Sequence, residues 1–258
     1  MTAAATAPTA PRIRRAALDR PAAMRLAATE YERYLDLLRE LSARDWTRRT
    51  ACPGWDVRAM AGHCLGMAEF ASSLREGTRQ YFAALRAYER EGGNPTDHLN
   101  ALQIAENGRL SADELVSRYA RVAPRAVRSR RRRPAPLRAR SMGAVELPDG
   151  SHERWTFGFM LDTVLTRDCW MHRADTARAT GREPVLTAEH DGVLVDDVVN
   201  EWAGRHGEPC TLTLDGPAGG YWAFGTGGPE LSFDAVEFCR ITSGRGHGDG
   251  LMATPVAF

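Results

Sequence analysis

The stretch RDCWMHRADTARATGR, residues 167–182, places an acid and a histidine four positions apart, Asp168 and His172. Its apolar spacing, followed by Gly181, is typical of a helix that ends at that glycine. Residues four apart in a helix project from the same face, one turn above the other. A carboxylate and an imidazole at this spacing can therefore bind one ion.

A second histidine, His63, lies in CPGWDVRAMAGH, residues 52–63, where Asp56 is expected to cap another helix. The apolar residues around His63 predict that it points inward. Two histidines and one carboxylate are a ligand set of catalytic zinc and of ferrous iron. The spacing of Asp168 and His172 is weak evidence alone, because about one such pair is expected by chance in this composition. The alternative is that the histidines are hydrogen-bonded core residues.

Length and composition indicate an ordinary globular chain that can form two compact domains. The 258 residues are 43% hydrophobic and 26% charged, with a net charge of +1. The near-zero charge argues against nucleic acid as a partner, and no apolar run approaches the roughly 20 residues that span a bilayer. The five cysteines form no CxxC motif and are expected to be free thiols in a reducing cytoplasm, where we place the protein.

Hydrophobic periodicity predicts a mainly α protein with an N-terminal four-helix bundle and a small α/β C-terminal domain. Residues 1–21 are expected to form a flexible tail, because they lack the apolar core of a signal peptide. The bundle is predicted over 22–183 and the α/β domain over 184–258, with two short strands in its centre. The helices are expected at about 22–46, 56–88, 111–122 and 155–181, with a shorter piece at 97–107.

All 34 basic residues are arginine, and ten of them lie between Leu115 and Val145, a stretch without an acid. Because Pro134 and Pro136 flank the densest part, we interpret residues 123–141 as a solvated linker. Two alternatives remain open: a contact to nucleic acid or phosphate, and a basic rim over a pocket for an anionic substrate.

Several motifs together resemble the DinB-like superfamily, and within it the mycothiol-dependent maleylpyruvate isomerase family. CPGWDVRAMAGH is similar to the family's helix-two motif, which ends in a metal histidine, and RDCWMHRADTARATGR is similar to its helix-four motif. GPAGGYWAFG (216–225) and SFDAVEFCRITSGR (232–245) resemble its appended sterol-carrier-like domain. The resemblance covers most of the chain, from about residue 25 to residue 258.

The resemblance implies a divalent metal, zinc in the first place, held by His63, Asp168 and His172. It also implies mycothiol as the thiol cofactor. One position departs from the family pattern, which has Glu where this chain has Asp168. The carboxylates of Asp and Glu are both zinc ligands. We therefore expect this departure to affect metal binding less than it affects the family's reaction. The implied function is a metal- and mycothiol-dependent isomerase or S-transferase that acts on a small electrophile, with a carboxylate favoured.

Asp175 and Arg245 are the candidate catalytic residues outside the metal ligands. Asp175, three residues after His172, can accept a hydrogen bond from its imidazole; the alternative is a surface ion pair with Arg178 or Arg182. Arg245 resembles a family arginine that can hold a substrate carboxylate bidentately, the alternative being an ordinary surface arginine.

Two other functions fit the same residues. One is a non-catalytic metal-binding DinB-like protein whose C-terminal domain binds a ligand. The other is a hydrolase that uses a metal-activated water and needs no thiol. The expected partners are a small substrate and a low-molecular-weight thiol, without a membrane; both a monomer and a homodimer remain open.

Overall fold

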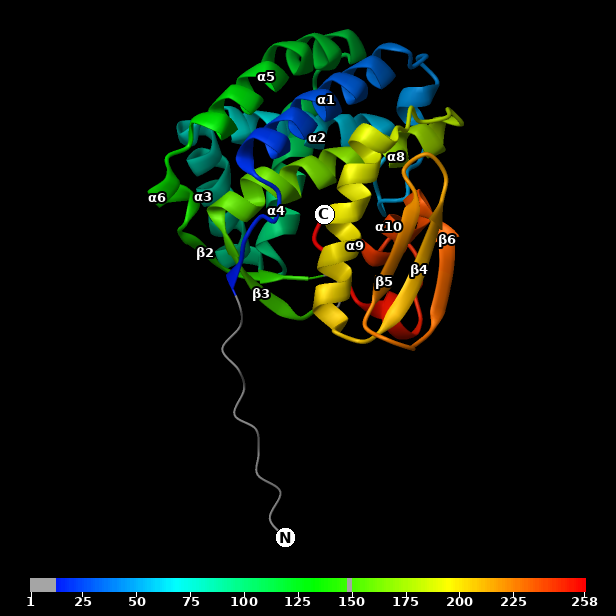
Figure 1. Ribbon diagram of the computed structural model, residues 1–258. Coiled ribbons are helices and arrows are strands. Elements are labelled where there is room, and N and C mark those ends of the chain that lie inside the picture. The colour runs from blue at the N-terminus through cyan, green and yellow to red at the C-terminus, as the bar shows by residue number, and fades with distance from the viewer. Residues whose placement is uncertain (1–12, 148–149) are drawn as a thin grey trace.

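A computed structural model describes residues 13–147 and 150–258. Its N-terminal part is a helical bundle in which α2 lies between its neighbours, while α3 and α4 extend the bundle to one side (Figure 1). The bundle helices are α1 (Arg20–Arg39), α2 (Val57–Ser72), α3 (Leu74–Glu91), α4 (Pro95–Asn107), α5 (Ala112–Arg132) and α8 (Leu165–Thr180). The predicted class, mainly α with a small α/β part, is confirmed. In the part of the chain described here, no helix is long and apolar enough to cross a membrane.

The single helix expected over 56–88 is two helices. The chain is extended at Ser73, with φ −152° and ψ 137°, and its hydroxyl accepts a hydrogen bond from the Glu76 amide at 3.3 Å. Serine is a good helix N-cap, so α3 begins anew in a different direction. The first helix is also shorter than expected. It ends at Arg39 and not near residue 46, and a short 3₁₀ turn, Asp45–Thr47, lies at the expected end.

The arginine-rich segment is helical, which corrects its interpretation as a linker. Helix α5 begins at the Ser111–Glu114 capping box and continues to Arg132, and α6 (Ala135–Arg138) follows after two extended residues. The apolar stripe of α5 continues past residue 122, with Ala123 and Ala126 buried in the bundle. Tertiary packing of that stripe outweighs the repulsion between neighbouring arginines.

A three-stranded sheet precedes α8, where the sequence predicts the start of a helix. It has the order β1-β3-β2, with β1 (Ile13–Arg14) parallel to β3 (His152–Thr156) and β2 (Ser141–Glu146) antiparallel to it. The helical course begins only with α7 (Phe157–Phe159) and a π-helical segment, Met160–Val164. Of the expected N-terminal tail, residues 1–12 lie outside the described residues, whereas residues 13–14 belong to this sheet.

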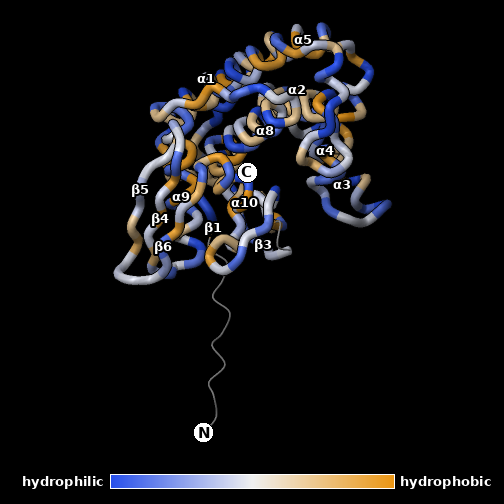
Figure 2. Tube along the Cα trace, turned by 90° about the vertical axis from the view of Figure 1, so that its right-hand side faces the viewer, coloured by the Kyte–Doolittle hydropathy of each residue, from blue (hydrophilic) through white to orange (hydrophobic). Residues whose placement is uncertain are grey.

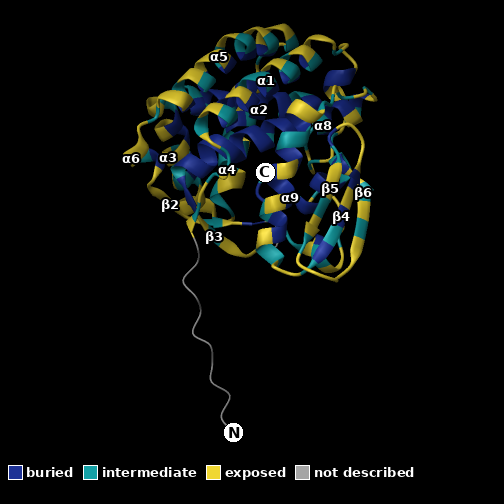
Figure 3. Cartoon of the chain, viewed as in Figure 1, coloured by how far each residue is buried: buried dark blue, intermediate teal, exposed yellow. Residues whose placement is uncertain are grey.

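The C-terminal α/β part packs directly on the bundle. Its sheet has the order β5-β4-β6, one strand more than the two expected. Its elements are α9 (Val193–His206), β4 (Cys210–Asp215), β5 (Gly220–Phe224), β6 (Glu230–Asp234) and α10 (Ala235–Thr242). One apolar cluster contains Trp170 and Met171 of α8 as well as Trp202 and Phe238 of this part. Figure 3 shows that α8 is buried between the helical bundle and the C-terminal part. Side chains on different faces of α8 therefore pack against different elements.

Candidate metal centre

Helices α2 and α8 bring together the three predicted metal ligands. His63 Nε2 lies 3.5 Å from Asp168 Oδ2, and His172 Nε2 lies 3.2 Å from Asp168 Oδ1. The two imidazole rings meet edge to face, with their centroids 5.0 Å apart. One ligand atom from each residue falls within 4.8 Å of the others. The sequence spacing on α8 and a contact with a second helix thus produce one compact cluster.

The donor atoms of this cluster suit a metal ion. Both histidines are buried, at 3% and 4% exposure, and neither ring nitrogen of His63 has a hydrogen-bond partner in the described structure. Buried polar atoms are normally paired, because leaving them unpaired costs free energy. A divalent cation would satisfy the free His63 nitrogen and the two Asp168 oxygens together.

Electrostatics within the cluster favour an ionised carboxylate. Burial disfavours the charge on Asp168, but the His172 and His63 imidazoles outweigh it and hold the pKa of this carboxyl well below its usual range. Burial also opposes protonation of His172, yet Asp168 and Asp175 raise the pKa of that imidazole well above 6.5. Without a metal, a proton on His172 therefore balances the charge of Asp168.

Asp175 lies behind His172 and joins it to the C-terminal part. Its Oδ2 is 3.7 Å from His172 Nδ1 and accepts a hydrogen bond from Arg245 Nε at 2.7 Å. Its Oδ1 accepts one from Arg240 at 2.8 Å. The surface ion pairs considered as an alternative for Asp175 do not form, because Arg178 faces Glu237 at 3.6 Å and Arg182 faces Asp45 at 3.0 Å.

Arg245 is not an ordinary surface arginine, since its side chain is largely buried beside the cluster. Its Nη2 lies 3.4 Å from His172 Nδ1 and 3.9 Å from Cys52 Sγ. Trp55 covers both imidazoles, with ring centroids 5.0 Å from His63 and 5.8 Å from His172. The motif CPGW therefore supplies two residues beside the cluster, Cys52 and Trp55, that the sequence did not assign to the site.

A buried arginine supports the helix that carries the acid. Arg130 donates from Nε to the Leu161 carbonyl at 2.7 Å and from Nη2 to Thr166 Oγ1 at 2.6 Å. Leu161 lies in the π-helical segment, whose irregular hydrogen bonding is frequent near functional sites. Because Arg130 is completely buried, it is unavailable for the nucleic-acid contact considered for the arginine-rich segment.

A second buried cluster lies on another face of α8. Arg173 bonds to both carboxylate oxygens of Glu30, at 2.7 and 3.1 Å, and to Asp191 Oδ1 at 2.6 Å. His190 Nε2 lies 2.9 Å from Glu30 Oε2, and Trp170 Nε1 donates to Asp191 at 2.8 Å. Three of these side chains, Glu30, His190 and Asp191, also group at metal-binding distance. Here the Arg173 guanidinium already bridges the two carboxylates.

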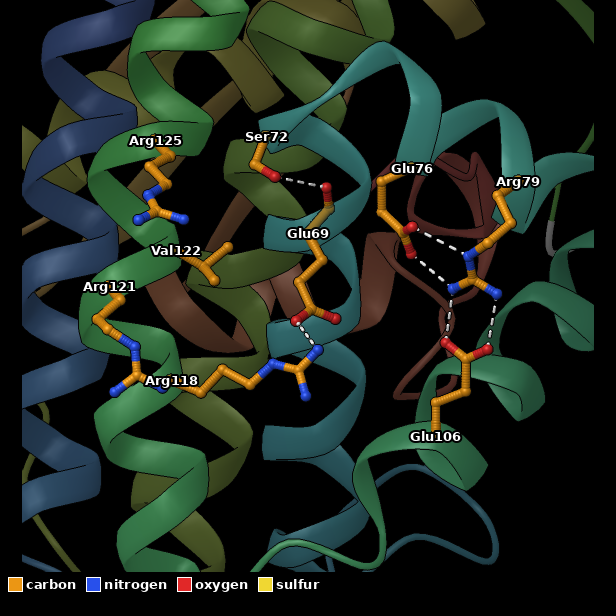
Figure 4. A pocket seen from close by; sticks show the side chains of 9 residues that line it. All are labelled: Glu69, Ser72, Glu76, Arg79, Glu106, Arg118, Arg121, Val122 and Arg125. Atoms are coloured by element: carbon orange, nitrogen blue, oxygen red, sulfur yellow. Dashed lines mark hydrogen bonds and ion pairs between the residues drawn. The ribbon is translucent and has the colours of Figure 1, made fainter.

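A surface hollow between α5 and the helices α2 to α4 lies apart from both clusters (Figure 4). Glu69 pairs with Arg118 at 2.6 Å, and Arg79 pairs with Glu76 and with Glu106. None of the three candidate metal ligands lines it. Its charges are largely compensated within its own walls, so it does not form part of the candidate site.

Comparisons with known proteins identify the same family as the motifs. The family model described as the mycothiol maleylpyruvate isomerase N-terminal domain matches residues 27–177. No curated protein matches the chain. A crystal structure of a mycothiol-dependent maleylpyruvate isomerase is similar in fold, with a TM-score of 0.55 at 18% identity, covering 90% of this chain and 92% of that one. The structure of a histidine mutant of such an isomerase gives a TM-score of 0.52 at 17% identity, covering 89% and 90%.

The family match covers more than half of the sequence and includes every residue from α2 to Asp175, that is, all three candidate metal ligands. The structural similarity extends beyond this match into the C-terminal part, because it covers nine-tenths of both chains. At this level of identity the structural similarity establishes the fold, and the family model establishes the relationship. The protein belongs to the mycothiol maleylpyruvate isomerase family.

Proposed function

We propose that this protein is a metal- and mycothiol-dependent isomerase or S-transferase that acts on a small electrophilic carboxylate. The observation that carries the proposal is the cluster of His63, Asp168 and His172, in which two buried histidines and a half-buried carboxylate converge. The His63 nitrogens have no hydrogen-bond partner among the described residues. Membership of the family supports the thiol cofactor.

The three side chains would hold the metal and leave further coordination positions open. A zinc ion bound there would supply a Lewis acid that lowers the pKa of a coordinated thiol, so that the nucleophilic thiolate forms near neutral pH. Asp168 keeps its negative charge because both imidazoles lower its pKa. The chain thus provides an anionic ligand without a separate deprotonation step.

Asp175 acts as a positioning residue. Its Oδ2 lies 3.7 Å from His172 Nδ1, and two arginines fix the orientation of the carboxylate. A carboxylate behind a ligating histidine sets its tautomer and its ring orientation. When Nδ1 carries a proton that faces Asp175, Nε2 is left as the free donor atom on the side of Asp168.

Arg245 supplies the positive charge for the substrate carboxylate. Its Nε donates to Asp175, whereas its Nη2 lies 3.9 Å from Cys52 Sγ and 3.4 Å from His172 Nδ1. A guanidinium keeps its charge at all relevant pH values and can bind a carboxylate through two N–H groups. Trp55 covers the imidazoles and limits the access of water, which strengthens these charge interactions.

The test combines metal analysis with thiol binding. Purified wild-type protein, His63→Ala and His172→Ala are compared by elemental mass spectrometry, and mycothiol is then titrated onto zinc-loaded protein. The proposal expects about one metal per chain in the wild type, loss of the metal in both variants, and mycothiol binding only to the metal form. If the wild type contained no metal even after it had been reloaded with zinc, the proposal would be contradicted.

The same preparation separates the rival functions. Turnover of an electrophilic unsaturated carboxylate that requires added mycothiol supports the isomerase or S-transferase. Hydrolysis without any thiol would identify a metal hydrolase. Stoichiometric metal without turnover of a panel of such electrophiles would favour the non-catalytic protein.

A further inference from the structure

Helix α3 exposes an unusual amount of apolar surface. Of the seven large hydrophobic side chains that are exposed in the described structure, four lie on this one helix. Their exposed fractions are 49% for Leu74, 43% for Tyr81, 50% for Phe82 and 40% for Tyr88. The rings of Tyr81 and Phe82 touch each other edge to face, with centroids 5.6 Å apart. An apolar patch of this kind on a soluble chain marks an interaction surface.

The side of α3 that packs on the bundle is small and polar instead. Its buried residues are Gly77, Gln80 and Ala84. The Gln80 amide donates to the Gly66 carbonyl at 3.3 Å and accepts from Gln103 at 2.9 Å. An amphipathic surface helix normally turns its apolar stripe to the core. Helix α3 does the reverse, so burial within this chain does not explain its aromatic stripe.

The exposed stripe has the spacing of a helix-pairing seam. The exposed Leu74, Thr78, Tyr81 and Tyr88 and the half-buried Leu85 alternate at steps of four and three residues, as the contact positions of two packed helices do. Helix α3 lies at the side of the molecule opposite the C-terminal sheet in both views (Figures 1 and 2). A second helix can therefore approach it without meeting that sheet.

Charges beside the stripe identify the partner as a second copy of this chain. Arg75 and Glu89 are both exposed and lie seven residues before and after Phe82. Neither has an ion-pair partner among the residues that the structure describes. When two α3 helices pack antiparallel with the twofold axis near Phe82, Arg75 of each copy faces Glu89 of the other. The two charges of one copy are thus complementary to the same two charges of its twin.

We propose that α3 forms the interface of a homodimer, with the two α3 helices packed antiparallel across a twofold axis near Phe82. Phe82, Tyr81, Leu85 and Tyr88 form the apolar centre of this interface, and two Arg75–Glu89 ion pairs flank it. The interface lies outside the candidate metal cluster, so dimer formation and metal binding are separate properties.

Analytical ultracentrifugation over a range of concentrations tests the dimer. The wild type is expected to have a mass near 57 kDa, twice the 28.4 kDa of one chain, and to dissociate on dilution. Phe82→Glu is expected to remain at 28.4 kDa. Tyr221→Glu, at a tyrosine that is 67% exposed on β5, is the matched control and should dimerise as the wild type does. A wild type that is monomeric at every concentration would overturn the proposal and leave the patch to another kind of partner.

Charge reversal tests the antiparallel arrangement. Arg75→Glu and Glu89→Arg each place like charges opposite each other twice, and each is expected to raise the dimer dissociation constant about fivefold, as exposed ion pairs allow. The double variant restores both pairs in reversed order and should return the constant to that of the wild type. Circular dichroism confirms that each variant is folded. A double variant that dimerises no better than the single variants would overturn the proposed packing.

Discussion

Two buried clusters share helix α8 and nearly the same residue types, yet their polar atoms are satisfied in different ways. The cluster of Glu30, Arg173, His190 and Asp191 has a guanidinium between its carboxylates, with bonds of 2.6 to 3.1 Å. Among the described residues, no guanidinium lies between the ligand atoms of His63, Asp168 and His172, and the His63 nitrogens have no hydrogen-bond partner. The first is a complete ion-pair network, whereas the second has the donor atoms that we propose to bind a metal. Residue composition alone therefore does not distinguish a structural cluster from a ligand site.

The largest expected difference between the clusters concerns metal binding. Loss of a ligand at His172→Ala should weaken zinc affinity by more than about 100-fold, beyond the range seen when only supporting residues change. His190→Ala, which removes a buried histidine from the other cluster, should leave zinc affinity within about twofold on the same scale. Competition with a chromogenic chelator measures both. A loss of metal in His190→Ala equal to that in His172→Ala would remove the distinction.

The second difference concerns stability. Arg173→Met leaves the buried Glu30 without a guanidinium and leaves Asp191 with Arg33 as its only arginine partner. We therefore expect the free energy of unfolding to fall by about 3–5 kcal/mol. The zinc content of the folded variant should stay that of the wild type. Urea denaturation measures the loss, with Arg178→Met as a control at a surface ion pair that contributes less than about 1 kcal/mol. If the two variants had the same free energy of unfolding, the Arg173 network would not contribute to the stability of the fold.

A third prediction concerns Asp175, which lies behind His172, one of the proposed metal ligands. Asp175→Asn keeps the shape of the side chain but removes the charge that faces His172 and the two arginines. We expect zinc affinity to fall about tenfold, the lower end for residues that orient a ligating histidine. Chelator competition gives the affinity, and a proton-detected imidazole spectrum reports the tautomer of His172. An unchanged affinity and tautomer would leave Asp175 as a link between the two parts of the chain only.

The fourth prediction follows from the raised pKa of His172. In metal-free protein, the stabilisation from protonated His172 is fully present below the unfolded pKa near 6.5 and is lost as the pH rises through the higher folded pKa. The melting temperature of metal-free protein should therefore decline above neutral pH. Zinc must displace this proton, so binding at pH 7 should release about one proton per metal, measured in weakly buffered solution. His172→Ala should show neither effect.

The smallest effect is expected for Asp168→Glu, which introduces the residue of the family pattern. Both carboxylates bind zinc at about 2.0–2.2 Å, so zinc affinity should remain within about tenfold of the wild type. Asp168→Asn is the control, because its amide has no charge to offer and should bind zinc far more weakly. If Asp168→Glu lost the metal as completely as Asp168→Asn, the distance between α2 and α8 would be tuned to the shorter side chain.

Local sequence signals predicted helix ends correctly where residues close together in the chain form the capping hydrogen bonds. The capping box of Ser111 and Glu114 is present, and Gly181 ends α8 in the left-handed conformation at φ 70°. The break at Ser73 was missed, because the same apolar periodicity continues on both sides of it. The burial of Arg130 was missed as well, since its partners, the Leu161 carbonyl and Thr166, lie more than thirty residues away.

The sequence by itself determined the helical class, the start of α5 at the Ser111 cap, the end of α8 at Gly181 and the shared face of Asp168 and His172. These features depend on interactions within one turn of helix. It also contained the motifs that resemble the family. Only the tertiary structure decided that His63 meets that face, that Arg240 and Arg245 bind Asp175, and that Arg173 rather than a metal joins Glu30 to Asp191. Each of these contacts joins segments that are far apart in the chain. The number of residues between two such segments does not indicate whether their side chains meet.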